Sequence, residues 1–207
     1  GIYFSHQINE KLAAGIGLTN PFGLGLEWGD DFPISGRAIS QNVDLKSFYI
    51  SPVAAYKLSD CISVGAGLDL VLSSITLKNR IYQPIDTTLI PYDLGEAKLE
   101  GSTNLAIGFT LSAMYKSEQW GAGFLYRHSI ENKLEEGDLT TPFGTEKVDA
   151  DLTYPNFLSI GVYRKLLDNM GIEVDYMWYN WSVFDKIIIT DENGAETELE
   201  QDYDNSW

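Results

Sequence analysis

The sequence predicts an all-β protein, an antiparallel transmembrane β-barrel of which about eight strands are present. First, residues 62–72 (ISVGAGLDLVL) alternate apolar with small or polar side chains in one unbroken phase. This run is long for a soluble strand, but it matches the ~9–11 residues that cross a bilayer as a tilted strand. Second, tight turns of about three residues alternate with loops of about fourteen or more. Third, aromatic residues gather near the predicted strand ends, as at a membrane interface.

Taken in order, each predicted strand has one apolar face. The strands are expected at residues 2–8, 12–28, 43–58, 62–78, 105–115, 120–128, 152–164 and 171–190. Short turns are expected at 9–11, 59–61, 117–119 and 167–169, and long loops at 29–42, 79–101 and 132–150. The alternation in 62–78 slips near Ser74, and Asn193-Gly194 is typical of a hairpin tip.

The main structural alternative is a soluble β-sandwich, whose strands also alternate but are shorter and need not alternate short with long connections. We favour the barrel, which would satisfy every backbone polar group in lipid by closing the sheet. No apolar run approaches the ~18 residues of a membrane helix. We expect residues 1–207 to be one partial barrel domain, because the chain begins at Gly1 inside a predicted strand and ends at Trp207 without an obvious stop.

Composition narrows the classes of function. The net charge of −16 argues against nucleic acid as a partner. The single cysteine, Cys61, excludes an intramolecular disulfide framework and a CxxC metal site, and we expect neither cofactor nor metal. His128 and Ser129 are adjacent, so on a strand they point to opposite faces and cannot form a nucleophile–base pair. Without a G-x-S-x-G or H-E-x-x-H motif, we expect no enzyme.

Two interruptions of the pattern carry information. Gly-x-Gly pairs follow three of the short turns, where they either relieve crowding or clear space for a plug. The second interruption is Asn20-Pro21-Phe22-Gly23, inside the predicted strand 12–28. Proline lacks a ladder donor, so either the strand has already left the membrane at Asn20 or the barrel wall has a local gap. Such a gap would let an apolar molecule pass sideways.

Several stretches together resemble a known family. They are Leu12–Gly23 (LAAGIGLTNPFG), Ala54–Gly67 (AAYKLSDCISVGAG), Trp120–Arg127 (WGAGFLYR), Leu152–Gly161 (LTYPNFLSIG) and Tyr176–Ile187 (YMWYNWSVFDKI). In order and spacing the chain is similar to the FadL/TodX-type outer-membrane transporters of long-chain fatty acids and other hydrophobic compounds. The resemblance implies a fourteen-stranded barrel that is plugged by an N-terminal hatch. By this resemblance, the hatch and the last strands of the barrel are not in this chain. It also implies capture at outer loops and exit through a gap at a kinked strand, which would place Asn20, Pro21, Phe22 and Gly23 at the opening.

The implied function is uptake of a fatty acid or an aromatic hydrocarbon by passive diffusion with lateral exit. A fatty acid needs a cation or donor for its carboxylate and an apolar groove for its tail. The cation candidates are Lys78, Arg80 and Arg127, although Arg127 could instead pair with Glu131, Glu173 or Asp175; the tail candidates are Val71, Leu125, Phe157 and Trp181. The alternative is a general porin or a structural or adhesive barrel. We expect a monomer in the outer membrane of a Gram-negative bacterium, in contact with its lipid and lipopolysaccharide.

Overall fold

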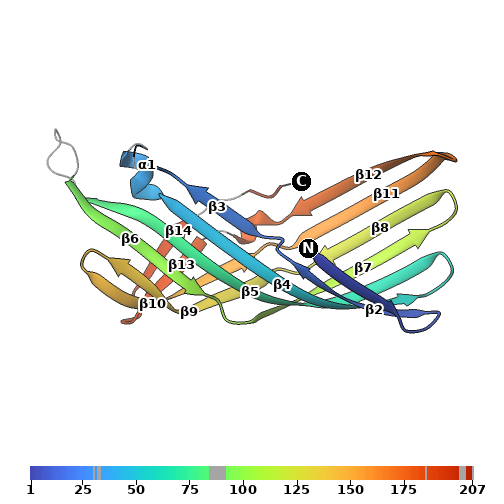
Figure 1. Cartoon of the computed structure of the whole chain (residues 1–207), viewed down its shortest axis with the longest axis horizontal. Helices are drawn as coiled ribbons and strands as arrows, with labels where there is room; N and C mark the ends of the chain where they lie inside the picture. Colours follow the sequence, from blue (N-terminus) through green and yellow to red (C-terminus); the bar gives the residue numbers. More distant parts are fainter. Residues whose placement is uncertain (30, 32–33, 84–91, 185, 201–203, 207) are drawn as a thin grey trace.

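The computed structural model describes residues 1–29, 31, 34–83, 92–184, 186–200 and 204–206, and it is built almost entirely of strands (Figure 1). One 14-stranded antiparallel sheet contains them all. The strands are β1 (Ile2–Gln7), β2 (Leu12–Thr19), β3 (Gly23–Glu27), β4 (Asn42–Lys57), β5 (Ile62–Gln83), β6 (Tyr92–Ser102), β7 (Ala106–Lys116), β8 (Trp120–Arg127), β9 (Ile130–Thr141), β10 (Gly144–Tyr154), β11 (Phe157–Leu167), β12 (Met170–Tyr179), β13 (Lys186–Asp191) and β14 (Glu196–Glu200). Helix α1 (Ile34–Ile39) and the 3-10 turn η1 (Trp181–Val183) complete the elements.

The sheet is a curved wall rather than a closed tube. Its two longest strands, β4 and β5, lie side by side at the centre, and the other edge of β5 pairs with β7 along its first half and with β6 along its second. The wall continues through β8, β11 and β12 at one end of the molecule and through β9, β10, β13 and β14 at the other. Within the described residues the sheet does not close on itself. The all-β antiparallel class predicted from the sequence is confirmed.

Two of the expected long loops are instead β-hairpins. Strand β5 continues to Gln83 and β6 begins at Tyr92, with residues 84–91 outside the described part of the chain. Residues 132–150 form most of the β9–β10 hairpin, and the loop at 29–42 carries α1. The pattern misled because the outward side chains of these hairpins are charged, which gives strands the composition of a solvated loop. The hairpin tip at Asn193-Gly194 is confirmed, with Gly194 at φ +80°.

The two faces of the sheet exchange character along its length. In the first half of β5, Leu68 and Leu72 face outward, 53% and 45% exposed, while Asp69 and Val71 face inward and are fully buried. Beyond Ser73 the inward side chains become apolar and the outward ones polar, although the β4–β5 register stays continuous. The expected slip near Ser74 is therefore wrong, because the surroundings change there and the backbone phase does not.

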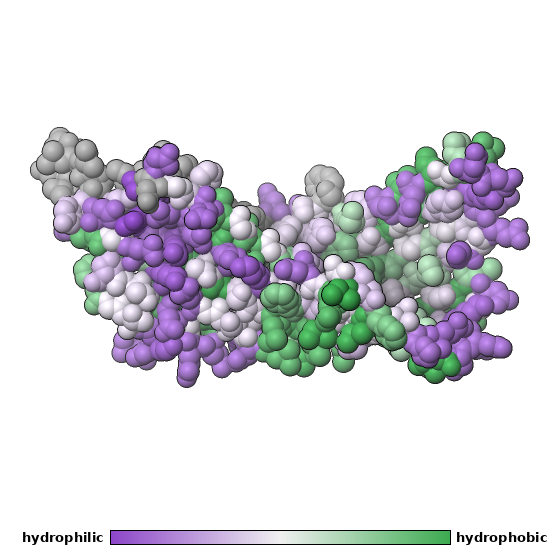
Figure 2. All heavy atoms as spheres, viewed as in Figure 1, coloured by the Kyte–Doolittle hydropathy of each residue, from purple (hydrophilic) through white to green (hydrophobic). Residues whose placement is uncertain are grey.

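Hydrophobic side chains consequently form a band on the outer surface over only part of the sheet. Figure 2 shows this band near the middle of one face, between a hydrophilic end that holds α1, β9 and β10 and the hydrophilic short turns at the other end. A membrane would face this band, with the α1 end standing out of the bilayer. No helix in the described residues is long and apolar enough to span a membrane.

Most strands are interrupted where the faces exchange character. The interruptions separate β2 from β3, β6 from β7, β8 from β9, β10 from β11 and β12 from β13, and we call this level of the sheet the waist. In the consecutive strands β8 and β9, Phe124 faces outward and Ile130 faces inward, although both have even numbers. The interruption thus shifts the alternation by one residue. Apolar side chains that face out below the waist face in above it.

Candidate functional site

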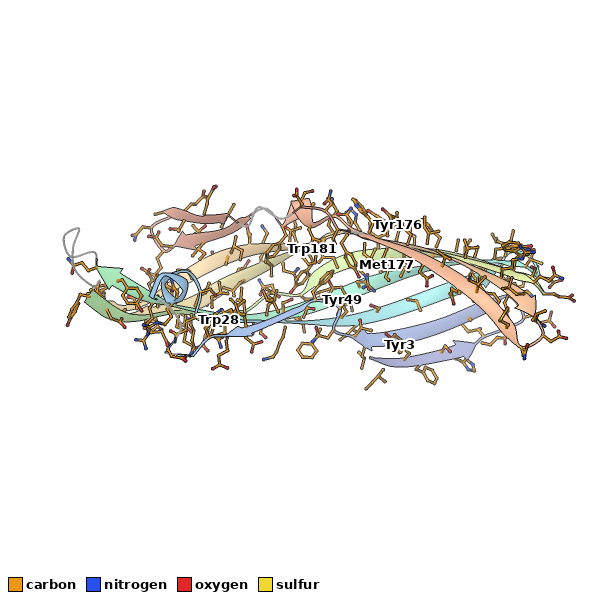
Figure 3. The ribbon with its side chains drawn as sticks, turned by 90° about the horizontal axis from the view of Figure 1, so that it is seen from above. Tyr3, Trp28, Tyr49, Tyr176, Met177 and Trp181 are labelled. Carbon is orange, nitrogen blue, oxygen red and sulfur yellow. The ribbon has the colours of Figure 1, made fainter. Side chains whose placement is uncertain are left out.

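Four aromatic rings meet on the concave side of the sheet at the waist, and we call them the aromatic cluster. They are Phe22, Tyr49, Tyr154 and Trp181. The ring of Phe22 stacks on Tyr154, with centroids 4.9 Å apart and planes 12° from parallel, and it meets Trp181 edge-on at 6.0 Å. Tyr49 lies 6.1 Å from Phe22 and 6.3 Å from Tyr154. Figure 3 shows Tyr49 and Trp181 near the middle of the sheet. Strands far apart in the sheet order therefore touch here.

Phe22 reaches the cluster because its strand is interrupted. The ladder to β4 pairs Thr19 with Tyr49 and resumes one step out of register with Gly23 opposite Lys46. Between these pairs the Ser47 hydroxyl donates to the carbonyl oxygen of Phe22 and accepts its backbone N–H at 3.2 Å. One side chain thus replaces the missing rungs of the ladder.

Asn20 and Pro21 complete the interruption. With its amide oriented to satisfy both groups, Asn20 donates from Nδ2 to the carbonyl oxygens of Phe22, at 2.8 Å, and Ser47, at 2.9 Å. Pro21 has no N–H to give to the ladder. On β4 the outward residue at this level is Phe48, 57% exposed, and the next outward residue toward the α1 end is Lys46. The interruption therefore lies at the border between the apolar band and the polar outer surface.

Above the cluster lies an apolar cavity of about 530 Å³, the upper cavity. Its lower part is lined by Leu45, Ile75 and Phe184, of which Ile75 belongs to the buried core around the aromatic cluster while the other two pack against it. Leu, Ile, Val and Ala side chains from β3, β4, β5, β6, β9, β10 and β13 make most of the remaining wall. Such a lining can hold an apolar molecule and offers few hydrogen bonds.

Below the cluster the inward side is polar. Asp69, fully buried, accepts hydrogen bonds from Thr110 Oγ1 at 2.6 Å and from the Ser51 hydroxyl, and it forms an ion pair with Arg127, whose Nε lies 3.1 Å from Oδ2. The guanidinium carbon of Arg127 also lies 5.2 Å from the centroid of the Tyr49 ring. The positive charge thus meets both a carboxylate and an aromatic face, which makes this site a fixed polar base under the cluster.

A second cavity, about 700 Å³, lies along the strands below the waist. Small residues such as Gly65 and Ser112 line it, together with the carboxylates Glu173 and Asp175. It shares no lining residue with the upper cavity. The aromatic cluster and its polar base therefore lie between the upper cavity and a lower cavity whose lining includes charged side chains.

The structure brings some of the predicted site residues together and separates others. Val71 is part of the buried core around the aromatic cluster, and Trp181 belongs to the cluster itself. Leu125 lines the lower cavity, and Phe157 packs on Tyr179 with centroids 4.7 Å apart. The predicted opening, residues 20–23, coincides with the interruption between β2 and β3.

The three predicted cations lie apart from one another. Lys78 borders the upper cavity and forms an ion pair with Glu96, 3.7 Å from Nζ to Oε1. Arg80 lies 3.8 Å from Asp93, from Nη1 to Oδ2. By the alternation of β5, the side chains of Lys78 and Arg80 share the face of Thr76, opposite Ile75 and Leu77. Arg127 pairs with a lumen carboxylate, which was one of the two roles considered for it. The partner is Asp69, however, and not Glu131, Glu173 or Asp175.

Sequence reasoning missed the residues that hold the site together. Asp69 carried a usable signal, since it is a lone charge in the inward phase of an otherwise apolar and glycine-rich strand. Ser47 carried none, because its role depends on contacts with a residue 25 positions away in the chain. Tyr154 lay in the stretch Leu152–Gly161 that carried the resemblance, but its hydrogen bond to Ser73, 81 positions away, could not be predicted. His128 accepts or donates one hydrogen bond with the Tyr126 hydroxyl at 3.0 Å and stacks on Phe109.

The sequence is similar to a known protein family and to curated outer-membrane proteins. The family model described as "Outer membrane protein transport protein (OMPP1/FadL/TodX)" matches residues 1–207. Outer membrane protein P1 of Haemophilus influenzae is 21% identical over 99% of this chain and 50% of its own length. The long-chain fatty acid transport protein of Escherichia coli is 20% identical over 93% of this chain and 52% of its own length. The chain thus spans about half the length of these curated relatives.

Solved structures show the same fold. A Pseudomonas aeruginosa FadL homologue superposes with a TM-score of 0.84 at 18% identity, over 98% of this chain and 53% of the other. The Ralstonia pickettii toluene transporter TbuX gives a TM-score of 0.73 at 18% identity, over 98% of this chain and 61% of the other. The curved sheet therefore has the fold of a corresponding part of an outer-membrane barrel.

Proposed function

Because the chain belongs to the OMPP1/FadL/TodX family of outer-membrane transport proteins, we propose that the whole protein takes up hydrophobic compounds by passive diffusion, with lateral exit at residues 20–23. The chain is part of an outer-membrane protein of a Gram-negative bacterium. The observation that carries the proposal is the position of Phe22. Its backbone is the strand interruption, and its ring is part of the aromatic cluster at the lower end of the upper cavity.

The proposed path begins in the upper cavity. An apolar molecule gains by leaving water for this lining, at roughly 25 cal/mol per Å² of apolar surface buried. Downward movement meets the polar base of Asp69 and Arg127, where an apolar molecule gains nothing. Sideways movement at residues 20–23 leads to the apolar band and hence to lipid. No energy input is needed, because the cargo moves from water into an apolar cavity and from there into lipid, and both environments favour an apolar molecule.

The cargo class follows from the lining and from the relatives. Two relatives are named as fatty acid transporters, and a solved structure as a toluene transporter. The upper cavity suits either an alkyl tail or an aromatic ring. For a carboxylate, Arg127 is the cation next to the aromatic cluster. Its hydrogen bonds come from Nε, and within the described residues its two terminal nitrogens donate none. Head-group contacts by Lys78 or Arg80 stay a prediction.

Binding of a fluorescent fatty acid to the full-length protein in detergent separates these cargoes. Competition by unlabelled fatty acid alone would favour fatty acids and a role for Arg127. Displacement by an aromatic hydrocarbon alone would favour hydrocarbons and leave Arg127 as a structural cation. No binding, together with a steady ionic conductance in planar bilayers, would support the alternative of a general porin.

The exit is tested by restoring the ladder. Pro21→Val supplies an N–H, and Gly23→Val adds a side chain at a site where a Cβ would meet its nearest neighbour at an ordinary 3.5 Å. We expect the double variant to assemble and to lose most uptake of labelled fatty acid or toluene by cells. The matched control is Pro142→Val in the exposed β9–β10 turn, which should transport normally. Undiminished uptake by the double variant would refute lateral exit at this site.

A further inference from the structure

The ring of Phe22 is attached to the wall differently from its neighbours in the aromatic cluster. Tyr154 is anchored by a hydrogen bond from its hydroxyl to Ser73 Oγ at 2.8 Å, and Tyr49 lies against the Arg127 guanidinium in an uninterrupted strand. Phe22 has no polar atom in its side chain and lies in the interruption between two strands. Phe22 is 8% exposed and belongs to the same buried core as Ile75, which lines the upper cavity.

We propose that Phe22 is the gate between the upper cavity and the lateral opening, and that Ser47 is the latch that keeps the gate closed. This inference rests on the proposed lateral exit and names the residues that control it. The closed position is held by ring contacts with Tyr154 and Trp181 and by the two hydrogen bonds between Ser47 and the Phe22 backbone.

Cargo can open this gate because it replaces what the ring loses. An apolar molecule that reaches Tyr154 and Trp181 offers them the same dispersion contacts that Phe22 offers, so the exchange costs little. The displaced ring moves toward the border of the apolar band, where Phe48 already faces outward. The remaining cost is the hydrogen bonds of the Phe22 backbone, two of them with Ser47, which is fully buried, and one from the Asn20 amide. Ser47 therefore sets the rate of opening, whereas Phe22 sets the width of the path.

The test compares uptake with binding in the full-length protein. In Ser47→Ala, loss of one net hydrogen bond should raise the initial uptake rate roughly fivefold, which corresponds to ~1 kcal/mol. Phe22→Ala should also raise uptake, while Phe22→Trp should lower it. In all three, the dissociation constant for a fluorescent fatty acid should stay within about twofold, because the upper cavity is untouched.

Matched controls separate gating from packing. Phe48→Ala removes the same ring from the outward face of the neighbouring strand and should leave uptake unchanged. Ser47→Thr keeps the hydroxyl and should stay close to the parent protein. The shift in gel migration between heated and unheated samples checks that each variant assembles. If Phe22→Ala does not assemble, Phe22→Leu takes its place.

The outcomes distinguish this inference from the proposal on which it rests. If Pro21→Val with Gly23→Val blocks uptake but Ser47→Ala and Phe22→Ala leave it unchanged or lower it, the exit stands and the gate is overturned. If neither set of changes alters uptake, lateral exit fails and the gate fails with it. Faster uptake in Ser47→Ala and Phe22→Ala with unchanged binding, and normal uptake in Phe48→Ala, supports the gate.

Discussion

Replacing Arg127 by methionine should destabilise the full-length protein by several kilocalories per mole. The change removes the ion pair to Asp69, the hydrogen bond from Nε and the contact with the Tyr49 ring, but it keeps a side chain of similar length. Asp69 is fully buried and would keep only the hydroxyl donors of Ser51 and Thr110. Removing one partner of a buried pair costs about 3–5 kcal/mol. Because the Arg127 side chain is 18% exposed, we expect the lower end of that range.

The assay is equilibrium unfolding in a denaturant, with the protein in lipid vesicles and gel migration or tryptophan fluorescence as the signal. A double-mutant cycle isolates the pair. Arg127→Met combined with Asp69→Asn should be milder than Arg127→Met alone, because no unpaired charge is left buried. Lys165→Met is the control, since its ion pair with Asp168 is exposed in a short turn and should be worth at most about 1 kcal/mol. A loss below about 1 kcal/mol in Arg127→Met, or a double variant that is no milder, would refute the reasoning.

Three further predictions concern the wall. Gly67→Val should cost about 1–3 kcal/mol, because even a Cβ at this site would lie 2.6 Å from a valine methyl of β4, whereas Gly123→Ala should be neutral in the same unfolding assay, having no neighbour within 4 Å. Leu68→Arg, in the apolar band, should cost about 2–4 kcal/mol in vesicles, whereas Thr76→Arg on the same face above the waist should assemble normally. The backbone N–H groups at the hairpin tip hold the pKa of Asp191 below its usual value, so the hairpin should lose stability as pH falls through that lowered pKa, and NMR titration of the carboxylate checks the direction.

Much of the lower wall could be predicted from sequence. Its strands alternate in one phase, and lipid outside with small or polar groups inside makes that alternation easy to detect. Leu68 and Leu72 face outward and Asp69 faces inward, as the phase of residues 62–72 predicts. The short turn at residues 59–61 is also where the pattern puts it, between β4 and β5.

The upper wall could not be predicted in the same way. Above the waist the apolar side chains face inward and the charged ones face water, so its hairpins have the polarity of a soluble protein. The one-residue shift between Phe124 and Ile130 leaves no mark in a pattern that counts alternate residues, because both residues stay even-numbered. The outward face passes from lipid to water at the waist, and in the sequence pattern this passage resembles a change of phase or a loop.

The candidate site was predicted by location and not by contacts. Pro21 marked the interruption because proline cannot donate to a ladder, and the structure places the break there. The ring stack of Phe22 on Tyr154 joins residues on strands that are not neighbours in the sheet, and no local pattern encodes such a pair. The same holds for the Ser47 hydroxyl, which is one of many serines until the register of β2, β3 and β4 is known.

The waist also divides the sheet between two kinds of driving force. Above it, an apolar interior is covered by a charged exterior, so burial there draws on the hydrophobic effect and should add to the heat capacity of unfolding. Below it, the outward apolar groups stay in hydrocarbon, where van der Waals packing and hydrogen bonds hold strands together without that effect. Changes of temperature, and salts that strengthen hydrophobic burial, should therefore act mainly on the part above the waist. Changes of lipid thickness should act mainly on the part below it. One continuous strand, β5, crosses from one regime to the other and mechanically joins two halves that respond to different solvents.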